Sequence, residues 1–483
     1  MRHPLFQKCA LLLIISLLLM LPLSMIQSAI DERTKFRNQA THAIAAATAG
    51  EQTITGPILV FPVDEYFDEE RTEKQGKQII KRIERYVIRH RIAVKPKQLD
   101  FNGDMKVEKR AYGLYDTNVF SLQEHISGHF ETPDAGALTL RNATSRLVWG
   151  NPTLILGIED PRGIDGEPKV MLDGQALQLR QGVRLTDADM KLPQRSSGVR
   201  EIALRSAKGD DERPEDNVFS AGHAAAAAFN IRAGFRAVGA HAYNGKTASL
   251  PFDITLTLSG TSSLTRIPLG ETTTAELRAD WPHPSFGGNY LPRSREVGEQ
   301  GFTARWSATA LAADGIADNH DGFQVSLINP VDIYQQATRA VKYGILFIAL
   351  GFAAFFAFEH LRTLPIHPIQ YLLVGLAQAI FFLLLVSLSE HIRFWLAYLV
   401  SAAASIALIA VYLAAILKGW RRALGFSLAQ ALLYAALFGI LRAEQNALLL
   451  GSLLLFAALA GLMIGTRRID WYGLGRSSTT GDN

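Results

Sequence analysis

Cysteine is almost absent from this sequence. The chain has 483 residues and one cysteine, Cys9, which lies inside an apolar run near the N-terminus. One cysteine cannot form a disulfide within the chain, and it cannot supply the several thiolates of a structural zinc site. An oxidising compartment stays open as a location, because domains without disulfides are stable there too.

The common catalytic fingerprints are also missing. We find no G-x-S-x-G nucleophile elbow, no phosphate-binding Walker loop and no dinucleotide-binding glycine pattern. Serine, histidine and carboxylate residues are numerous, but no spacing among them singles out a nucleophile. The sequence therefore predicts no catalytic residue, no cofactor site and no metal site, and it favours a protein that is not an enzyme.

Long apolar runs are present at both ends of the chain. Residues 9–30 form the first run, and the chain is mostly apolar again from Tyr343 to Gly465. About 20 apolar residues cross a hydrocarbon core of about 30 Å as a helix. Five C-terminal segments satisfy this length: 343–361, 369–389, 394–416, 423–441 and 446–465. With the first run, the pattern predicts a membrane protein with a bundle of six transmembrane helices.

Basic residues near the ends of these segments indicate their orientation. Suppose that Arg2 and Lys8 are cytoplasmic. With six spans, Arg362, the basic group around Lys418 and the tail at Arg467 then also lie on the cytoplasmic side of the membrane. Both termini are then cytoplasmic, and residues 31–340 lie in the periplasm. Cleavage of the first run after Ala29 is the alternative, but Gln27 would then occupy a position that favours a small residue. The net charge of +4 does not indicate nucleic-acid binding, because much of the positive excess flanks the spans.

Charged residues are missing from the middle of every expected span. The centres carry only Gln378, Gln430 and small residues, whereas Glu359, Glu390 and their neighbours lie near the ends. A charge at the centre of the bilayer costs about 2.5–3.5 kcal/mol on insertion scales, so ion-coupled transporters keep one where it acts. The pattern argues against a transporter.

The segment between the apolar ends has the period-two alternation of β-strands. In "FDITLTLSG" the apolar residues from Phe252 to Leu258 alternate with polar ones. Further strand candidates are "GPILVFPV", "YVIRHRIAV", "KRAYGLYDTNVFSLQEHISGHFE", "LILGI", "QALQL" and "FTARWSATA". We predict a large β-rich, sandwich-like periplasmic domain over residues 31–340, with an insertion or seam at about 205–247 and a short helix in "SAGHAAAAAFN". It follows an N-terminal anchor (1–30) and precedes a five-helix transmembrane domain (341–466) and a cytoplasmic tail (467–483).

Two polar patterns have ordinary structural explanations. His125 and His129 in "EHISGH" share a strand face, but positions four apart on a strand are separated by about 13 Å, too far to share one metal ion. Arg89 and Arg91 in "YVIRHRIAV" alternate with apolar residues. We interpret them as a solvated strand face, with contact to an anionic polymer or lipid head group as the alternative.

The stretch "ADWPHPSFGGNYLPRS" at 279–294 is the most unusual part of the domain. Its two central prolines donate no hydrogen bond to a sheet, so this segment cannot be a central strand. Two glycines then permit a reversal of the backbone. The result is a stiff loop whose aromatic residues either pack into the core or form a stacking platform for a ligand; these candidate residues are Trp281, His283, Phe286 and Tyr290.

The same stretch carries a resemblance to a known family. "WPHPSFGGNYLPRSREVGEQGFTARW" resembles the signature of the CreD family of inner-membrane proteins of Gram-negative bacteria, and the likeness continues in "HPIQYLLVGLAQAIFFLLLVSLSEH", "LKGW", "RRIDWY", "GPILVFPV" and "EDPRGI". The resemblance implies a large periplasmic domain, control by a two-component system, and effects on envelope integrity and the β-lactam response. It supplies no catalytic residues, and residues 205–247 look longer than the family leads one to expect.

Two hypotheses for function follow. In the first, the periplasmic domain binds an envelope component or a partner protein, and the helices hold it in the lipid bilayer. In the second, the chain is a membrane enzyme acting on cell-wall or lipid intermediates, with Glu390, His391 and His283 as acid and base at the periplasmic surface. The missing catalytic pattern favours the first.

Overall fold

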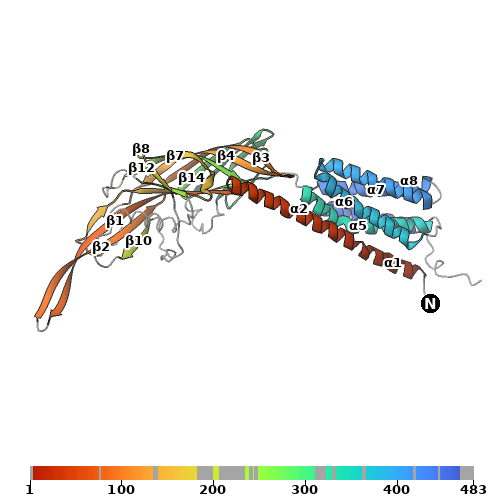
Figure 1. Ribbon diagram of the computed structural model, residues 1–483, viewed down its shortest axis with the longest axis horizontal. Coiled ribbons are helices and arrows are strands. Elements are labelled where there is room, and N and C mark those ends of the chain that lie inside the picture. The colour runs from red at the N-terminus through yellow and green to blue at the C-terminus, as the bar shows by residue number, and fades with distance from the viewer. Residues whose placement is uncertain are drawn as a thin grey trace, which may run out of the picture. The chain divides into compact units, whose positions relative to one another are not determined.

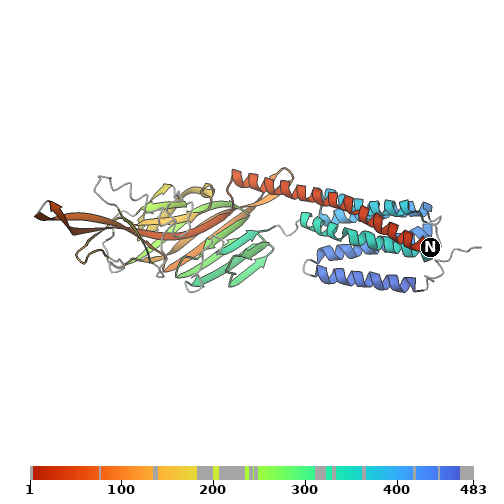
Figure 2. The same ribbon diagram turned by 90° about the horizontal axis from the view of Figure 1, so that it is seen from below.

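The computed structural model describes residues 4–75, 78–133, 140–181, 199–205, 234–238, 243, 248–309, 322–328, 333–361, 366–416, 420–443 and 446–467. The chain divides into two compact units (Figures 1 and 2). Unit 1 comprises Met1–Asn38 and Pro330–Asn483, and unit 2 is Gln39–Asn329. The expected tail at 467–483 lies outside the described residues after Arg467.

Unit 1 is helical. Its elements are α1 (Pro4–Leu18), the first part of α2 (Met20–Ala47), α5 (Ile333–Leu361), α6 (Pro368–Ser389), α7 (Phe394–Ile416), α8 (Trp420–Arg442) and α9 (Ala447–Thr466). Five described helical stretches are long and apolar enough to cross a membrane, and a shorter apolar stretch, Leu449–Gly461, lies within α9. Five of the six predicted membrane helices meet these criteria, and most helix ends lie within a few residues of the expected positions.

The N-terminal helix differs from the expected anchor of residues 1–30. It is interrupted at Leu19, because Pro22 has no N–H to donate to the carbonyl of Leu18. Beyond residue 30 the backbone stays helical to Ala47, so the apolar segment and a polar segment form one helix. Apolar length marks where a helix leaves the hydrocarbon, but it does not mark where the helix ends.

The start of α6 accounts for the residues "HPIQ". His367 is the N-cap, and its Nδ1 accepts a hydrogen bond from Ile369 N at 3.3 Å. Gln370 Oε1 accepts one from His367 N at 3.1 Å, and Pro368 occupies the first turn, where its missing N–H costs nothing. This is a capping box, in which two side chains satisfy backbone groups at the helix start.

Unit 2 consists mainly of two β-sheets. The ten-stranded sheet has the path β15-β18-β13-β1-β6-β11-β9, with β2 and β5 also paired to β1 and β10 paired to β2; the eight-stranded sheet has the order β16-β17-β14-β3-β4-β12-β7-β8. The strands are β1 (Gln52–Gln75), β2 (Gln78–Val94), β3 (Gln98–Tyr112), β4 (Tyr115–Glu131), β5 (Arg146–Trp149), β6 (Thr153–Ile158), β7 (Ile164–Leu172), β8 (Gln175–Ala176), β9 (Gln178–Gln181), β10 (Val199–Arg205), β11 (Gly234–Val238), β12 (Ser249–Thr261), β13 (Ser263–Ile267), β14 (Thr272–Ala279), β15 (Pro284–Gly287), β16 (Ser294–Gly298), β17 (Gly301–Thr309) and β18 (Phe323–Leu327).

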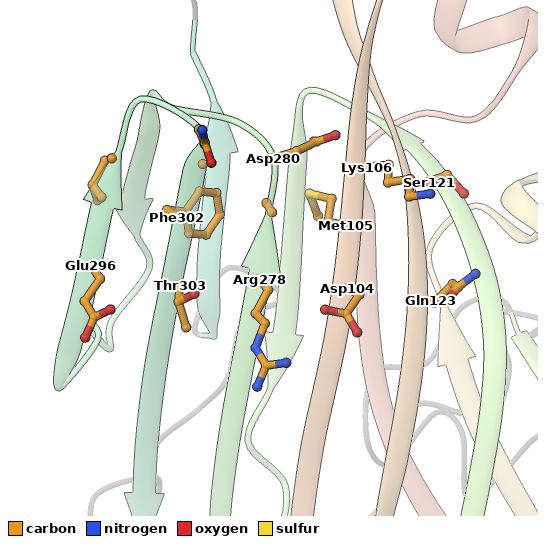
Figure 3. Close-up of a pocket in the computed structure, with 15 residues that line it drawn as sticks. Asp104, Met105, Lys106, Ser121, Gln123, Arg278, Asp280, Glu296, Phe302 and Thr303 are labelled. Carbon is orange, nitrogen blue, oxygen red and sulfur yellow. The ribbon is translucent and has the colours of Figure 1, made fainter.

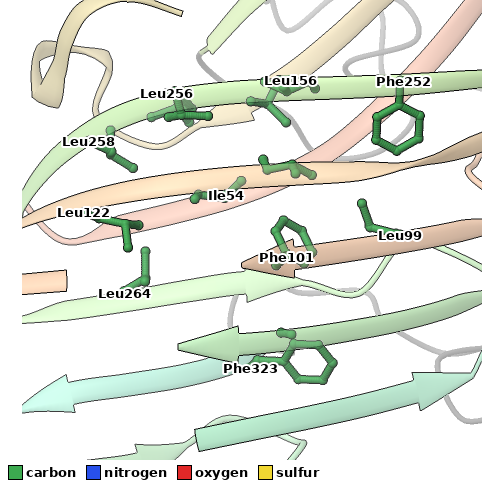
Figure 4. Packing of buried hydrophobic residues seen from close by; sticks show 14 of the residues in the cluster. Ile54, Leu99, Phe101, Leu122, Leu156, Phe252, Leu256, Leu258, Leu264 and Phe323 are labelled. Atoms are coloured by element: carbon green, nitrogen blue, oxygen red, sulfur yellow. The ribbon is translucent and has the colours of Figure 1, made fainter. Parts of the chain in front are cut away.

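The two sheets share one hydrophobic core. Ile54, Leu156 and Leu264 come from the ten-stranded sheet, while Phe101 and Leu256 come from the eight-stranded sheet, and all five belong to one buried cluster (Figure 4). Each such side chain contributes about 1.5–3 kcal/mol by leaving water. The alternation that predicted strands therefore also predicted which face of each strand packs inward, and the sandwich-like arrangement of two facing sheets is observed.

The strand predictions are confirmed with changes in detail. The long candidate at 109–131 is a hairpin, because Gly113 turns the chain between β3 and β4 with a φ of 65°. The interpretation of Arg91 as solvated is wrong: Arg91 is buried, and its Nη1 donates a hydrogen bond to the carbonyl of His90 at 2.9 Å. Within 205–247, Gly234–Val238 forms β11 beside β6, whereas the expected helix in "SAGHAAAAAFN" lies outside the described residues.

Candidate functional site

The loop at 279–294 packs as a corner of unit 2. Trp281 belongs to the core, and its Nε1 donates a hydrogen bond to the carbonyl of His283 at 3.0 Å. Pro284–Gly287 forms β15, which pairs only with β18 among the described strands and so lies at a sheet edge, where a proline is tolerated.

Its remaining aromatic side chains pack against the core. The ring of Phe286 meets Phe302 and Trp306 edge-on at centroid distances of 5.6 and 5.9 Å, and Tyr290 meets Phe323 at 5.7 Å. Phe286 and Tyr290 are partly buried. The structure thus brings Trp281, Phe286 and Tyr290 into the packing of the domain, which favours the corner over the stacking platform.

The corner also supports a neighbouring hairpin. Asp280 Oδ1 accepts a hydrogen bond from Val107 N at 2.7 Å, just beyond the last residue of β3 that pairs with β14. Lys109 Nζ lies 5.7 Å from the centroid of the Trp281 ring, within range of a cation–π contact. The loop therefore braces the part of β3 that extends past the sheet.

A hollow of about 700 Å³ lies on the outer face of the eight-stranded sheet (Figure 3). One row of directly paired residues crosses five strands there: Glu296, Thr303, Arg278, Asp104 and Gln123. Neighbouring strands are about 4.8 Å apart, so the row extends about 19 Å. It offers a carboxylate, a hydroxyl, a guanidinium, a second carboxylate and an amide. Such a row suits hydrogen bonding to an extended polar chain lying across the strands.

The motif "EDPRGI" joins the end of α2 to both sheets. Arg162 Nη1 donates to the carbonyl of Ala46 in the last turn of α2 at 2.9 Å, while Arg162 Nη2 contacts Asp160 Oδ2 at 2.6 Å. Asp160 Oδ2 also accepts from Gly50 N at 2.9 Å. The buried Gln52 amide donates to the carbonyls of Asp160 and Ser259 at 3.0 and 2.8 Å. We call these residues, from Asp160 to Gly163 with Gln52, the helix clasp.

The helix clasp makes the stability of unit 2 depend on acid pH. The hydrogen bonds from Arg162 hold the pKa of Asp160 below its usual range; burial acts in the opposite direction, and the backbone N–H groups of Gly50 and Arg162 add to the lowering. The contribution is fully present above the ordinary pKa of about 3.9 and is lost as the pH falls through the lower folded-state value. We expect the unfolding temperature of the wild type to fall more steeply below about pH 4 than that of Asp160→Asn. Parallel pH profiles would contradict this assignment.

Glu390, the candidate acid at the membrane edge, is already engaged. Its Oε1 accepts a hydrogen bond from the hydroxyl of Tyr334 at 3.2 Å and lies 3.5 Å from Arg33 Nε. These contacts tie α2 and α5 to the end of α6, where Glu390 is the C-cap. His391 next to it is exposed. His283 lies in unit 2 and Glu390 in unit 1.

A matching cluster lies at the other end of α5 and α6, where the N-terminal partner comes from α1. Glu359 of α5 forms an ion pair with Lys8 of α1 and accepts a hydrogen bond from the Tyr371 hydroxyl of α6 at 2.6 Å. Lys8 and Arg33 are 25 residues apart, or about 37 Å along a helix. This separation slightly exceeds a hydrocarbon core of about 30 Å. The two clusters therefore lie about as far apart as the thickness that a membrane-spanning helix has to cross.

Sequence reasoning missed a buried ion pair between the sheets. Glu124 of β4 and Arg266 of β13 are 0 % and 2 % exposed, and Arg266 Nη2 lies 2.7 Å from Glu124 Oε2. The signal was present, because Glu124 continues the inward alternation of Phe120 and Leu122. The neighbouring His125 points outward and lies 3.2 Å from Asp253. Among the described residues no group of three potential metal ligands comes together.

Comparison with known proteins agrees with the resemblance seen in the motifs. Residues 4–472 match the model of a family described as inner membrane protein CreD. A curated relative with the same description, from Escherichia coli (strain K12), is 32 % identical over 482 residues, covering 98 % of this chain and 95 % of the relative. The matched range thus extends over both units.

Proposed function

Because the chain belongs to the CreD family of inner membrane proteins, we propose that it is a non-enzymatic envelope protein whose unit 2 lies in the periplasm. In this proposal six helices cross the inner membrane and both termini are cytoplasmic. The distribution of lysine and arginine supports the orientation, and the apolar length of α9 supports the sixth span.

Cysteine labelling tests this topology in intact cells. With Cys9→Ala as background, Gln175→Cys in unit 2 is expected to react with a membrane-impermeant maleimide added outside the inner membrane. Arg421→Cys, at the start of α8, is the matched control and is expected to react only after the membrane is opened. The reverse pattern would place unit 2 in the cytoplasm and end the proposal.

The hollow on the eight-stranded sheet carries the second part of the proposal. Its paired row from Glu296 to Gln123 lies on an open sheet face and supplies donors and acceptors of both charges. We propose that this row binds an extended polar chain, either an envelope component or a segment of a partner protein. The contacts of Glu390 with Arg33 and Tyr334 support a structural role for that carboxylate, which weakens the case for an enzyme.

Crosslinking from living cells tests the binding row. A photoreactive residue in place of Gln123 is expected to capture a reproducible adduct, whereas one in place of Lys169, exposed on β7 away from the hollow, is expected to capture none. Adding Arg278→Ala and Asp104→Ala should abolish the Gln123 adduct. Equal capture at both positions would show that contact with this sheet is nonspecific.

We also propose that binding at this row acts in the envelope-stress and β-lactam response, under two-component control. Cells that carry the Arg278→Ala and Asp104→Ala chain at normal abundance are expected to respond to a β-lactam as cells without the chain do. His283→Ala and Phe286→Ala test the neighbouring loop in the same assay. If the chain with Arg278→Ala and Asp104→Ala supports a normal response to the β-lactam, the hollow plays no part in that response.

A further inference from the structure

The turn between β3 and β4 exposes apolar side chains where hairpins ordinarily carry polar ones. Tyr112 is 60 % exposed and Leu114 is 63 % exposed, on either side of Gly113. Two-residue hairpin turns favour glycine, asparagine and aspartate. Gly113 meets that requirement with its positive φ, and its surroundings are open, since an added Cβ would meet nothing within 4 Å. Turn geometry therefore accounts for Gly113 but not for Leu114.

This turn projects beyond the body of its sheet. β14 pairs with β3 only as far as Met105, and β12 pairs with β4 only as far as Val119. The hairpin continues past both points with its own two strands, braced on one side by Asp280 and Trp281. All residues from Glu108 to Leu114 are exposed. We call residues 108–116 the hairpin tip.

Both chain connections to the membrane helices leave unit 2 next to this hairpin. The hydroxyl of Thr41 on α2 lies 2.8 Å from that of Thr117, and Asn118 Nδ2 donates to the carbonyl of Leu327 at 2.8 Å. Leu327 is the last residue of β18, and α5 begins six residues later at Ile333. The hairpin tip thus belongs to the end of unit 2 at which the chain is tethered to its membrane-spanning segments.

Two cations lie next to the exposed apolar residues of the hairpin tip. Lys109 and Arg110 directly precede Ala111 and Tyr112, and Lys106 lies just beside the tip, while Glu108 and Asp116 are its acidic residues. Tyrosine is enriched at the level of lipid head groups, and basic residues near a bilayer are attracted to anionic lipids. Exposed tyrosine and leucine flanked by cations are the composition of a segment that enters the interfacial layer.

We propose that the hairpin tip docks into the head-group layer of the membrane that anchors the chain. Leu114 and Tyr112 enter the interface, and Arg110 and Lys109 lie at the level of the lipid phosphates. The corner at Asp280 and Trp281 gives the hairpin the rigidity to hold this position. The ligand of the hairpin tip is an anionic phospholipid surface. This proposal does not depend on which side of the membrane unit 2 occupies, so it is independent of the topology proposed above.

Fluorescence quenching of the full-length chain tests the proposal. Cys9→Ala removes the one native cysteine, and Ala111→Cys places a small fluorophore in the tip without replacing Tyr112 or Leu114. The chain is reconstituted into vesicles of phosphatidylethanolamine and phosphatidylglycerol. Gln175→Cys is the reference, because the turn at 173–174 lies beside the opposite end of β4, where Leu172 pairs with Phe252 and Phe252 with Gly128.

We expect acrylamide in the water to quench the label at residue 111 several-fold less than the label at 175, and quenchers carried on the lipids to quench only the former. Tyr112→Ser with Leu114→Ser should return the label at 111 to the behaviour of the reference. Equal aqueous quenching at both sites would overturn the proposal. A label at 111 that is shielded from water but untouched by lipid-borne quenchers would also overturn it, because a protein would then cover the tip.

Discussion

Replacing Arg266 by methionine is expected to lower the free energy of unfolding of unit 2 by about 3–5 kcal/mol, the range found when one partner of a buried ion pair is removed. The guanidinium of Arg266 is the partner of the buried Glu124 carboxylate and also donates to the carbonyl of Glu276 at 3.3 Å. Without Arg266, the carboxylate would be left between two sheets with its charge uncompensated. Unfolding of the whole chain in detergent, followed by tryptophan fluorescence, to which the buried Trp306 contributes, measures the change.

The loss should depend on pH in a defined direction. Burial raises the pKa of Glu124, and the charge of Arg266 opposes that rise. Removing Arg266 raises the pKa further, so the folded state of Arg266→Met binds a proton that the unfolded state releases. Because the folded state then holds more protons, stability falls as the pH rises above the ordinary glutamate pKa of about 4.3. We therefore expect a larger deficit for Arg266→Met at pH 8 than at pH 5.

Two further variants separate the ion pair from simple packing. Glu124→Met combined with Arg266→Met replaces both charges by apolar groups, and we expect it to recover most of the loss of the single variant. Arg278→Met is the surface control; its guanidinium contacts Glu276 on the exposed face, and we expect a change below about 1 kcal/mol. If the double variant is as unstable as Arg266→Met alone, the pair stabilises unit 2 through the packing of its side chains rather than through charge compensation.

Replacing Gly163 by alanine is expected to destabilise unit 2 by about 3 kcal/mol, at the upper end of the usual cost of overpacking. A Cβ at this position would lie 2.1 Å from the carbonyl oxygen of Ser259 and 2.5 Å from Gln52 Nε2. The carbonyl belongs to β12, so relief requires a backbone shift within the sheet. That shift would move the helix clasp, including the contact between Arg162 and the end of α2.

Hydrogen exchange shows whether the clasp is the part that fails. In Gly163→Ala we expect faster exchange at residues 44–50 than at the strands of the core, together with the lower unfolding temperature. Gly166→Ala is the matched control, because Gly166 has a φ of 74° but nothing within 4 Å of an added Cβ. It reports the cost of backbone strain alone. If both variants lose the same stability and leave residues 44–50 protected, the close approach to Ser259 is not what requires glycine.

The helices and strands could be predicted from local pattern because each reflects one physical requirement. A long apolar run has to be helical in lipid, where every backbone group needs a partner within the segment. Alternation such as that of Phe252 to Leu258 has to be a strand with one buried face. Helix ends were harder to predict: the last turn of α2 is held by Arg162, which lies 116 positions from Ala46 in the chain.

Prediction of the functional site was limited for the same reason, because residues that meet in the structure are far apart in the sequence. Trp281, His283, Phe286 and Tyr290 were chosen because aromatic residues cluster between prolines and glycines, but clustering does not say whether the rings face outward. The packing of Phe286 against Phe302 and of Tyr290 against Phe323 decides that for these two rings, whereas His283 is exposed. The row from Glu296 to Gln123 was not predicted at all, because its members come from five strands and only the sheet register places them side by side.

The sequence alone determined that the chain has apolar membrane helices at both ends and a β-rich body between them, because hydrophobic length and alternation depend only on neighbouring residues. Tertiary structure decided which polar groups meet. The pairing of Glu124 with Arg266, of Glu390 with Arg33 and of Asp280 with the base of the hairpin each joins segments far apart in the chain. Such contacts arise from strand order and helix packing, which no local pattern specifies.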